Sequence, residues 1–250
     1  MDPATALIIL GILQKIAVGA GVAALLKLAA KSPEAVRWLR RYVLGSNILV
    51  VGQARAGKTS FYNYLKHGEF ADTHPTEPTD RVSKPMRFPV NRGADLQFNV
   101  SKAFDIPGDL PVSEQIDIVR RKRPKALMIF LSPLRENVEG WLPADEWFGQ
   151  FTAQLRSLLV LDHKVAKHLR CLKVVLNKID AINDADREQL LDKLHGILEE
   201  EWGKLFTTRL KNVKVIPCTL RKDKGGELSA KVIVLELVSC LRKNETLLKP

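Results

Sequence analysis

A glycine-rich turn between an apolar strand and a helix constrains the fold of this chain more than any other feature. Residues 47–61 read "NILVVGQARAGKTSF" and contain the pattern G-x-x-x-x-G-K-[ST] at Gly52, Gly57, Lys58 and Thr59. Residues 48–51 are apolar enough for a buried strand, and residues 60–66 can open a helix. Because the pattern has meaning only between a strand and a helix, its placement indicates a phosphate-binding loop.

Such a loop binds phosphate through its backbone. Its glycines let the chain curl so that several N–H groups point inward, and the following helix adds its positive N-terminal end. We expect Lys58 to reach the β- and γ-phosphates and the Thr59 hydroxyl to ligate Mg²⁺. The alternative to a phosphate-binding loop is a glycine turn that joins the strand to the helix and binds no ligand. The residues expected to contact the nucleotide here are Gly52, Gln53, Ala54, Arg55, Ala56, Gly57, Lys58, Thr59 and Ser60.

Strands and helices alternate along the rest of the chain. The expected strands cover residues 48–51, 86–90, 96–106, 126–132, 171–177 and 213–219. The expected helices cover residues 60–66, 110–123, 145–169, 184–206 and 227–243. This alternation predicts an α/β fold in which helices cover both faces of a mostly parallel sheet. We divide the chain into an N-terminal apolar and basic helical segment, residues 1–44, and one α/β domain, residues 45–250.

A second motif follows the phosphate loop. The stretch "FDIPGD" ends a long strand with Asp105 and Gly108, which match D-x-x-G. A carboxylate at the carboxyl end of a neighbouring strand lies where ligands bind in open α/β sheets. Asp105 can therefore hold Mg²⁺, directly or through water, and the N–H of Gly108 can sense the terminal phosphate. The tetrapeptide alone is a weak signal, and its position after the phosphate loop gives it weight.

A third motif, "NKID", ends another apolar strand and can read the base. The two oxygens of Asp180 can accept hydrogen bonds from the N1–H and the exocyclic amino group of guanine, whereas adenine presents an acceptor at N1. A site built for such polar pairing rejects the mismatched base by roughly 10⁴-fold. Lys178 can lay its methylene stem along the base, and Asn177 can tie this loop back to the phosphate-binding segment.

These three motifs, in this order, resemble those of Ras-like small GTPases, the group that includes Arf and the β subunit of the signal-recognition-particle receptor. The resemblance covers roughly residues 45–245. It implies a P-loop G domain with a six-stranded sheet, one antiparallel edge pair, bound GTP or GDP with Mg²⁺, and hydrolysis of GTP to GDP and phosphate. It also implies a threonine that closes on Mg²⁺, for which Thr76 matches best and Thr79 is the second candidate. In the last family motif, the backbone after Cys218 would meet the guanine carbonyl, with Cys218, Thr219 and Leu220 in a loose match.

Two positions depart from this family. Asp109 stands where Ras-like enzymes place a water-orienting glutamine, and its charge would repel the γ-phosphate, so we expect slow hydrolysis. Arg55 replaces a small residue inside the loop and would either point to solvent or lie along the phosphates. Lys58, Thr76 and Gly108 are the candidate catalytic residues, and Thr59, Thr76 and Asp105 the candidate metal ligands. We expect a switch that needs a regulatory or effector protein. The alternatives are a GTP-binding scaffold that works through its N-terminal segment, and an ATP-using enzyme.

The N-terminal segment is far more apolar than the rest. A window of about 19 residues from Leu7 has a mean hydropathy of roughly 2, which nominates a transmembrane segment. Against this, Gln14 and Lys15 lie in its middle, where a lysine costs about 3 kcal/mol. The apolar stretches on either side are shorter than the roughly 20 residues a span needs. Asp2 and the lack of a basic residue before the apolar core disfavour a cleaved signal peptide.

Basic residues cluster at the starts of the expected strands and the ends of the helices, opposite the nucleotide. They are Arg37, Arg40, Arg41, Arg120, Arg121, Lys122, Arg123, Lys125, Lys164, Lys167, Arg170, Arg209, Lys211, Arg242 and Lys243. Together with the net charge of +11, they fit a cytoplasmic protein docked on an anionic membrane, at about 1 kcal/mol per well-placed basic residue. The helix dipole also favours basic residues at helix ends. The alternatives are a leader packed on the domain or on a partner, and a nucleic-acid-binding face, which we expect least. Three scattered cysteines indicate neither a disulfide framework nor a metal site.

Overall fold

The computed structural model divides into two compact units, Met1–Gly45 and Ser46–Pro250. It describes residues 46–67, 86–90, 98–106, 108–134, 141–202, 213–221 and 225–246. The N-terminal helix expected from the sequence, Thr76 and Thr79 lie outside these residues.

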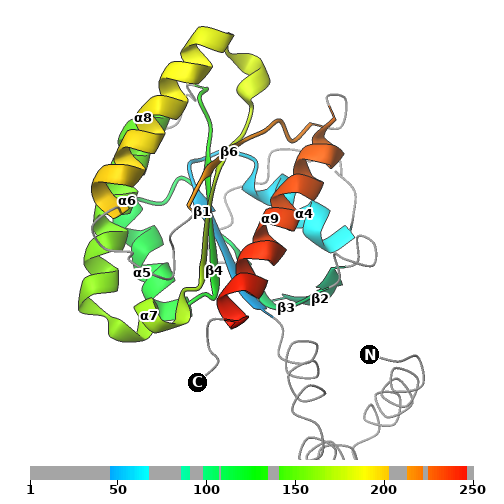
Figure 1. Cartoon of the computed structure of the whole chain (residues 1–250), viewed down its shortest axis with the longest axis vertical. Helices are drawn as coiled ribbons and strands as arrows, with labels where there is room; N and C mark the ends of the chain where they lie inside the picture. The colour runs from blue at the N-terminus through cyan, green and yellow to red at the C-terminus, as the bar shows by residue number, and fades with distance from the viewer. Residues whose placement is uncertain are drawn as a thin grey trace, which may run out of the picture. The chain divides into compact units, whose positions relative to one another are not determined.

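Described strands form one sheet in the order β2-β3-β1-β4-β5-β6 (Figure 1). Their bounds are β1 Ser46–Gly52, β2 Met86–Val90, β3 Phe98–Asp105, β4 Ala126–Leu131, β5 Cys171–Leu176 and β6 Val215–Pro217. β2 pairs antiparallel with β3, and the other neighbours pair in parallel. The expected α/β fold with a mostly parallel sheet is confirmed.

Helices cover both faces of this sheet (Figure 1). Their bounds are α4 Lys58–His67, α5 Val112–Lys122, α6 Ala144–Leu161, α7 His163–His168, α8 Asp184–Trp202 and α9 Gly226–Thr246, with a 3₁₀ turn at Ile179–Ala181. α5, α6, α7 and α8 pack on the face that includes Leu49 and Val51, whereas α4 and α9 pack on the face that includes Ile48 and Val50. The central strands read as continuous apolar runs because both of their faces are covered.

The parallel register brings the functional loops to one edge of the sheet. Ile48 pairs with Ala126 and Gly52 with Phe130, while Leu131 pairs with Leu176 on the next strand. The carboxyl ends of β1, β4 and β5 therefore lie at the same level. Every side chain of β4 and β5 is buried, and burial of each large aliphatic side chain contributes about 1.5–3 kcal/mol. This apolar layer is the rigid base that holds the loops above it.

One long helix predicted from the sequence is interrupted. Residues 145–169 form α6 and α7, with Asp162 between them. One carboxylate oxygen of Asp162 accepts hydrogen bonds from the backbone N–H groups of Lys164 and Val165, at 2.9 and 3.2 Å. This N-cap satisfies donors at the start of α7 and so favours a new helix at that position. Among the described residues, no helix combines the length and the apolar character that a membrane crossing requires.

Substitution of Gly52 tests how tightly the sheet edge constrains the loop. Gly52 has φ +135°, and a Cβ there would overlap the Phe130 carbonyl oxygen and lie 2.7 Å from the Phe130 nitrogen. We expect Gly52→Ala to lower the free energy of unfolding by about 3 kcal/mol or more. Gly196→Ala is the matched control, since nothing lies within 4 Å of a Cβ there, and it should raise stability by about 0.5–1 kcal/mol. Urea denaturation of both variants gives the comparison, and equal stabilities would contradict it.

Candidate functional site

The loop between β1 and α4 curls through backbone conformations that favour glycine. φ is +135° at Gly52, +53° at Arg55 and +91° at Gly57. Left-handed φ values let successive N–H groups turn toward one side, as a phosphate cradle requires. A Cβ at Gly57 would overlap the Asn177 side-chain nitrogen, so the loop also needs glycine for close packing. The Arg55 side chain is exposed, which favours the interpretation that it points to solvent.

Lys58 lies across this loop instead of extending away from it. Lys58 is only 5% exposed. Its Nζ donates hydrogen bonds to the carbonyl oxygens of Gly52 and Gln53, at 3.1 and 2.5 Å. A buried ammonium is costly unless it is hydrogen-bonded, and these carbonyls supply that stabilisation. The ammonium is thereby held inside the curl, where the sequence predicts the β- and γ-phosphates.

Gln53 ties the phosphate loop to neighbouring segments, whereas the sequence predicts that it contacts phosphate. Its Nε2 donates to the Leu142 carbonyl at 2.8 Å, and its Oε1 accepts from the backbone N–H of Ser132 at 2.8 Å. Its own backbone N–H donates to the Phe130 carbonyl at 3.1 Å. The side chain and the N–H of Gln53 are therefore both used to tie the loop to the end of β4 and to the start of α6.

Gln115 is a second supporting residue, and sequence reasoning missed it. This fully buried side chain accepts a hydrogen bond from the Gly52 N–H at 3.0 Å through Oε1. Its Nε2 donates to the carbonyls of Leu110 and Gly52, at 3.0 and 3.4 Å. A glutamine among apolar residues on the buried face of α5 was the available signal, because a buried amide needs partners. Gln115 joins the phosphate loop to the segment that follows D-x-x-G.

The second motif contacts the first. A Cβ at Gly108 would overlap the Lys58 Nζ and lie 2.5 Å from the Ala54 nitrogen, so Gly108 packs directly on the phosphate loop. Asp105 ends β3, and its backbone pairs beside Val50 of β1. The Asp109 side chain is exposed.

The third motif is joined to the phosphate loop by Asn177. This buried side chain donates from Nδ2 to the Ala56 carbonyl at 3.0 Å. Its Oδ1 accepts from the backbone N–H of Leu220 at 2.8 Å and lies 3.8 Å from the Cys218 Sγ. The expectation that Asn177 ties its loop to the phosphate-binding segment agrees with these contacts. Three loops from distant parts of the chain meet at one amide.

Asp180 stands at the surface beside this junction. Its Oδ1 accepts a hydrogen bond from the Thr219 hydroxyl at 3.1 Å, which orients the carboxylate. Lys178 adopts φ +63° and begins the 3₁₀ turn that carries Asp180. Cys218 lies beneath, where burial raises the pKa of its thiol to about 12. Cys218, Thr219 and Leu220 therefore contact Asn177 and Asp180, the residues for which the sequence predicts a role at the base.

Thr59 supplies a hydroxyl oxygen, a hard ligand of the kind that Mg²⁺ binds while it keeps several waters. Thr59 is half-buried at the first turn of α4, and Asp105 ends the strand next to β1. In the part of the chain that the structure describes, no group of three or more His, Cys, Asp or Glu residues could hold a metal ion.

Comparison with known proteins finds similarity in structure alone. No known family model and no curated protein matches the chain. One matching solved structure is a bacterial selenocysteine-specific elongation factor EF-Sec, 19% identical with a TM-score of 0.49 over 80% of this chain. Another is the translation elongation factor SelB from Methanococcus maripaludis in complex with the GTP analogue GPPNHP, 17% identical with a TM-score of 0.48 over 78% of this chain. The match spans 29% and 34% of those chains, so a functional conclusion must come from the site itself.

Replacement of Asn177 tests the junction of the three loops. Asn177→Asp keeps the shape but loses the donor to the Ala56 carbonyl, and it sets a carboxylate oxygen against that carbonyl. We expect the free energy of unfolding to fall by about 3 kcal/mol. The loss should be largest at neutral pH and smaller near pH 4, because burial raises the pKa of a carboxyl and protonation restores a donor. Urea denaturation at both pH values measures this, and a variant as stable as the parent would refute the role of Asn177.

Proposed function

We propose that residues 45–250 form a guanine-nucleotide-binding domain that hydrolyses GTP slowly with Mg²⁺ and works as a switch in the cytoplasm. The observation that carries this proposal is the hydrogen bond from Asn177 to the Ala56 carbonyl at 3.0 Å, across 121 residues of sequence. It holds Asn177 beside Ala56, which supports a base-reading loop next to the loop that holds the phosphates. A base and a phosphate chain of one nucleotide can then be held together.

Each motif has a distinct role in this proposal. Lys58 exchanges its contacts with the Gly52 and Gln53 carbonyls for contacts with the β- and γ-phosphates. Thr59 and Asp105, with Thr76 from outside the described residues, would hold Mg²⁺, which would neutralise phosphate charge. Gly108 packs on Lys58 and Ala54, and its N–H would respond to the terminal phosphate. A change at that phosphate would reach Gln115 through the segment at Leu110.

Asp180 selects guanine in this proposal. Its carboxylate is oriented by Thr219, and it would accept both hydrogen bonds from the N1–H and the amino group of guanine. An amide at the same position offers one oxygen and an NH₂ group in place of two acceptors. Adenine would oppose the carboxylate with an acceptor, so the carboxylate would lose its partners without replacement.

Titration calorimetry with GTP, GDP and ATP in the presence of Mg²⁺ tests the nucleotide. We expect GTP and GDP to bind, and ATP to bind at least about 100-fold more weakly, as a polar base-reading pocket implies. Asp180→Asn should reduce this GTP-to-ATP ratio by about tenfold or more, since one charge-assisted hydrogen bond contributes roughly 1.5–3 kcal/mol. Glu188→Gln, an exposed carboxylate on α8, is the control and should change nothing. No guanine nucleotide binding by the parent chain would end the proposal, and an unchanged ratio in Asp180→Asn would favour an ATP-using enzyme.

Asp109 makes the hydrolysis slow. A carboxylate near the γ-phosphate repels the phosphate charge, at roughly 1 kcal/mol for a separation of about 4 Å in water, and it does not position the attacking water as a glutamine would. We expect Asp109→Gln to raise the single-turnover rate by about fivefold or more, and to tighten GTP binding by no more than about fivefold because the same repulsion is removed from bound GTP. Asp117→Asn, which removes an exposed charge from α5, is the matched control. Rapid hydrolysis by the parent chain would contradict the slow reaction.

A scaffold that binds GTP and hydrolyses it negligibly is the second candidate. It is favoured by the same Asp109 and by the absence of the usual glutamine at that position. Turnover measured together with binding separates the two functions, because a scaffold shows binding with no multiple turnover even when a regulatory protein is added. In both cases we expect a protein partner, since a switch needs an effector that distinguishes its states.

A further inference from the structure

We propose that the surface formed by the carboxyl-terminal ends of α5, α6 and α7 docks on an anionic lipid membrane, with Leu161 entering the headgroup region. We call it the basic end surface. It lies at the pole opposite the phosphate loop, where the strands of the sheet begin (Figure 1). The charges and the exposed side chains of this surface do not depend on a bound nucleotide.

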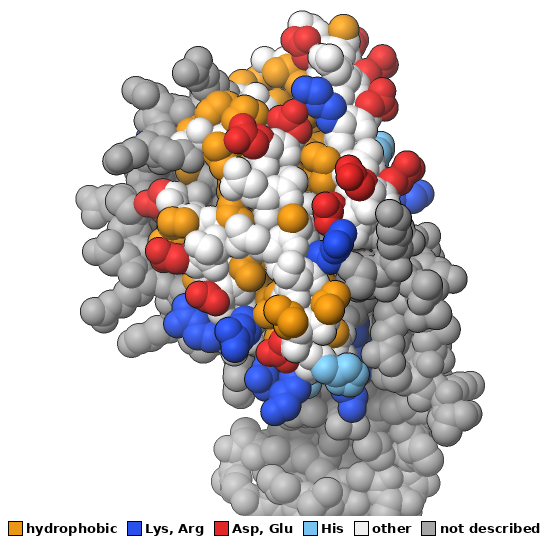
Figure 2. Space-filling model, turned by 90° about the vertical axis from the view of Figure 1, so that its left-hand side faces the viewer, with side chains coloured by type: hydrophobic (Ala, Val, Ile, Leu, Met, Phe, Trp, Pro, Cys, Tyr) orange, Lys and Arg blue, Asp and Glu red, His pale blue; other side chains and the backbone are white. Residues whose placement is uncertain are grey.

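Exposed basic side chains dominate this surface. Figure 2 shows that Lys and Arg gather at the lower end of the face formed by α5–α8, whereas Asp and Glu predominate over its upper part. The exposed members of the basic end surface are Arg120, Arg121, Arg123, His163, Lys164, Lys167 and His168. The carboxylate of Asp162 lies among them, and its hydrogen bonds to the backbone of α7 already occupy it.

Separate contacts place these side chains on one surface. The hydrogen bond from the Val165 N–H lowers the pKa of Asp162 most, and the nearby charges of Arg123 and Arg120 lower it further. The end of α5 therefore lies beside the junction of α6 and α7. The Lys125 N–H donates to the Asn47 carbonyl at 2.9 Å, and the Arg170 N–H donates to the Lys125 carbonyl at 2.8 Å. These bonds hold the starts of β1, β4 and β5 at the same pole.

Two exposed aliphatic side chains at the end of α6 favour a membrane over a nucleic acid. Leu161 is 85% exposed and Val160 is 61% exposed, at the end of α6. The helix dipole explains basic residues at helix ends, but it does not explain a leucine in water. Single-stranded nucleic acid binds through exposed aromatic rings, and the exposed large hydrophobic residues of the described chain are all aliphatic. Leucine among basic residues fits the boundary between headgroups and acyl chains.

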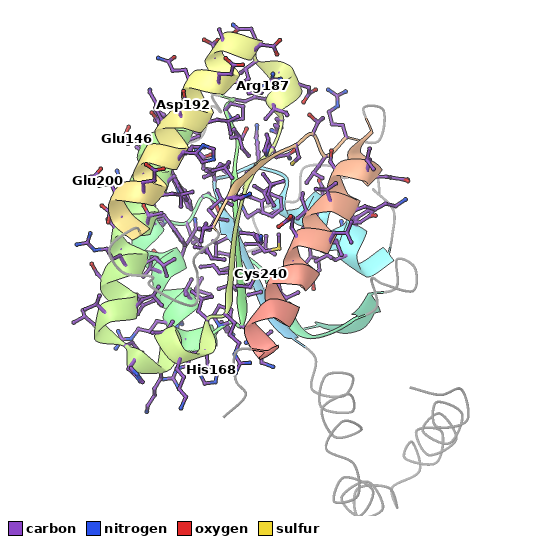
Figure 3. All side chains as sticks on the ribbon, in the orientation of Figure 1. Glu146, His168, Arg187, Asp192, Glu200 and Cys240 are labelled. Atoms are coloured by element: carbon purple, nitrogen blue, oxygen red, sulfur yellow. The ribbon has the colours of Figure 1, made fainter. Side chains whose placement is uncertain are left out.

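The opposite charge at the other end would set the orientation. Figure 3 places Glu146, Asp192 and Glu200, together with the one labelled arginine, Arg187, in the upper half of the domain, and His168 at its lower end. An anionic leaflet attracts the basic end surface and repels the acidic upper part. The domain would then stand on the membrane with its phosphate loop directed away from the lipid, open to the cytosol.

Vesicle flotation of the full chain tests this proposal. We expect binding to phosphatidylcholine vesicles containing about 30% phosphatidylserine that weakens between roughly 0.1 and 0.5 M salt, as screened charges require. Lys164→Gln with Lys167→Gln should lower the partition coefficient on these vesicles by about thirtyfold, or roughly fivefold for each charge removed. Leu161→Ser should lower it by about tenfold, because the leucine no longer leaves water.

Matched variants control for charge and for hydrophobicity. Lys193→Gln with Lys231→Gln removes the same charge from exposed positions on α8 and α9. Leu228→Ser removes a leucine that is 70% exposed on α9. Both should bind vesicles within about twofold of the parent chain. Guanine nucleotide affinity and urea denaturation, measured for every variant, show whether each is folded and keep this test separate from that of the proposed nucleotide function.

Three outcomes would overturn the proposal. In the first, the parent chain does not bind vesicles, or it binds them equally well without phosphatidylserine. In the second, the Lys164/Lys167 variant and its charge control lose vesicle binding equally. The third is binding of single-stranded RNA that the Lys164/Lys167 variant loses while its vesicle binding stays at the parent level. That result would assign the surface to nucleic acid.

Discussion

The buried amide of Asn177 is the interaction on which the arrangement of the site depends. It is the point where the phosphate loop, the end of β5 and the loop after β6 share hydrogen bonds. A buried amide that lost one partner would pay the desolvation cost of the unmatched group. The three loops therefore keep one relative position, and the geometry of the site follows from that requirement more than from any loop alone.

The fold could be predicted from sequence because its signals are local. Continuous apolar runs such as residues 126–131 indicate strands covered on both faces, and the spacing of Gly52 and Gly57 indicates a turn with left-handed residues. The break between α6 and α7 was missed because Asp162 caps a helix inside a segment whose apolar pattern stays helical on both sides. The N-cap at Asp162 therefore outweighs the helical spacing of apolar residues at that position.

The site was less predictable, because supporting side chains find their partners across the sheet. Gln53 was assigned to the nucleotide by its place in the motif, yet its side chain bonds to Ser132 and Leu142, far away in sequence. Gln115 carried no motif at all. Sequence patterns identify residues that share a local spacing. The residues that hydrogen-bond to a loop depend instead on the register between strands, and that register is known only once the sheet is assembled.

Lys58 has a consequence for how a ligand would enter. Its ammonium already closes the curl through two backbone carbonyls of the same loop, so the cationic centre does not have to be recruited from solvent. An incoming anion would find its counter-charge in place and would replace the two carbonyl oxygens as the partner of the ammonium. The loop is therefore ordered before an anion binds. The conformational entropy that a flexible site loses at each binding event is lost here when the chain folds.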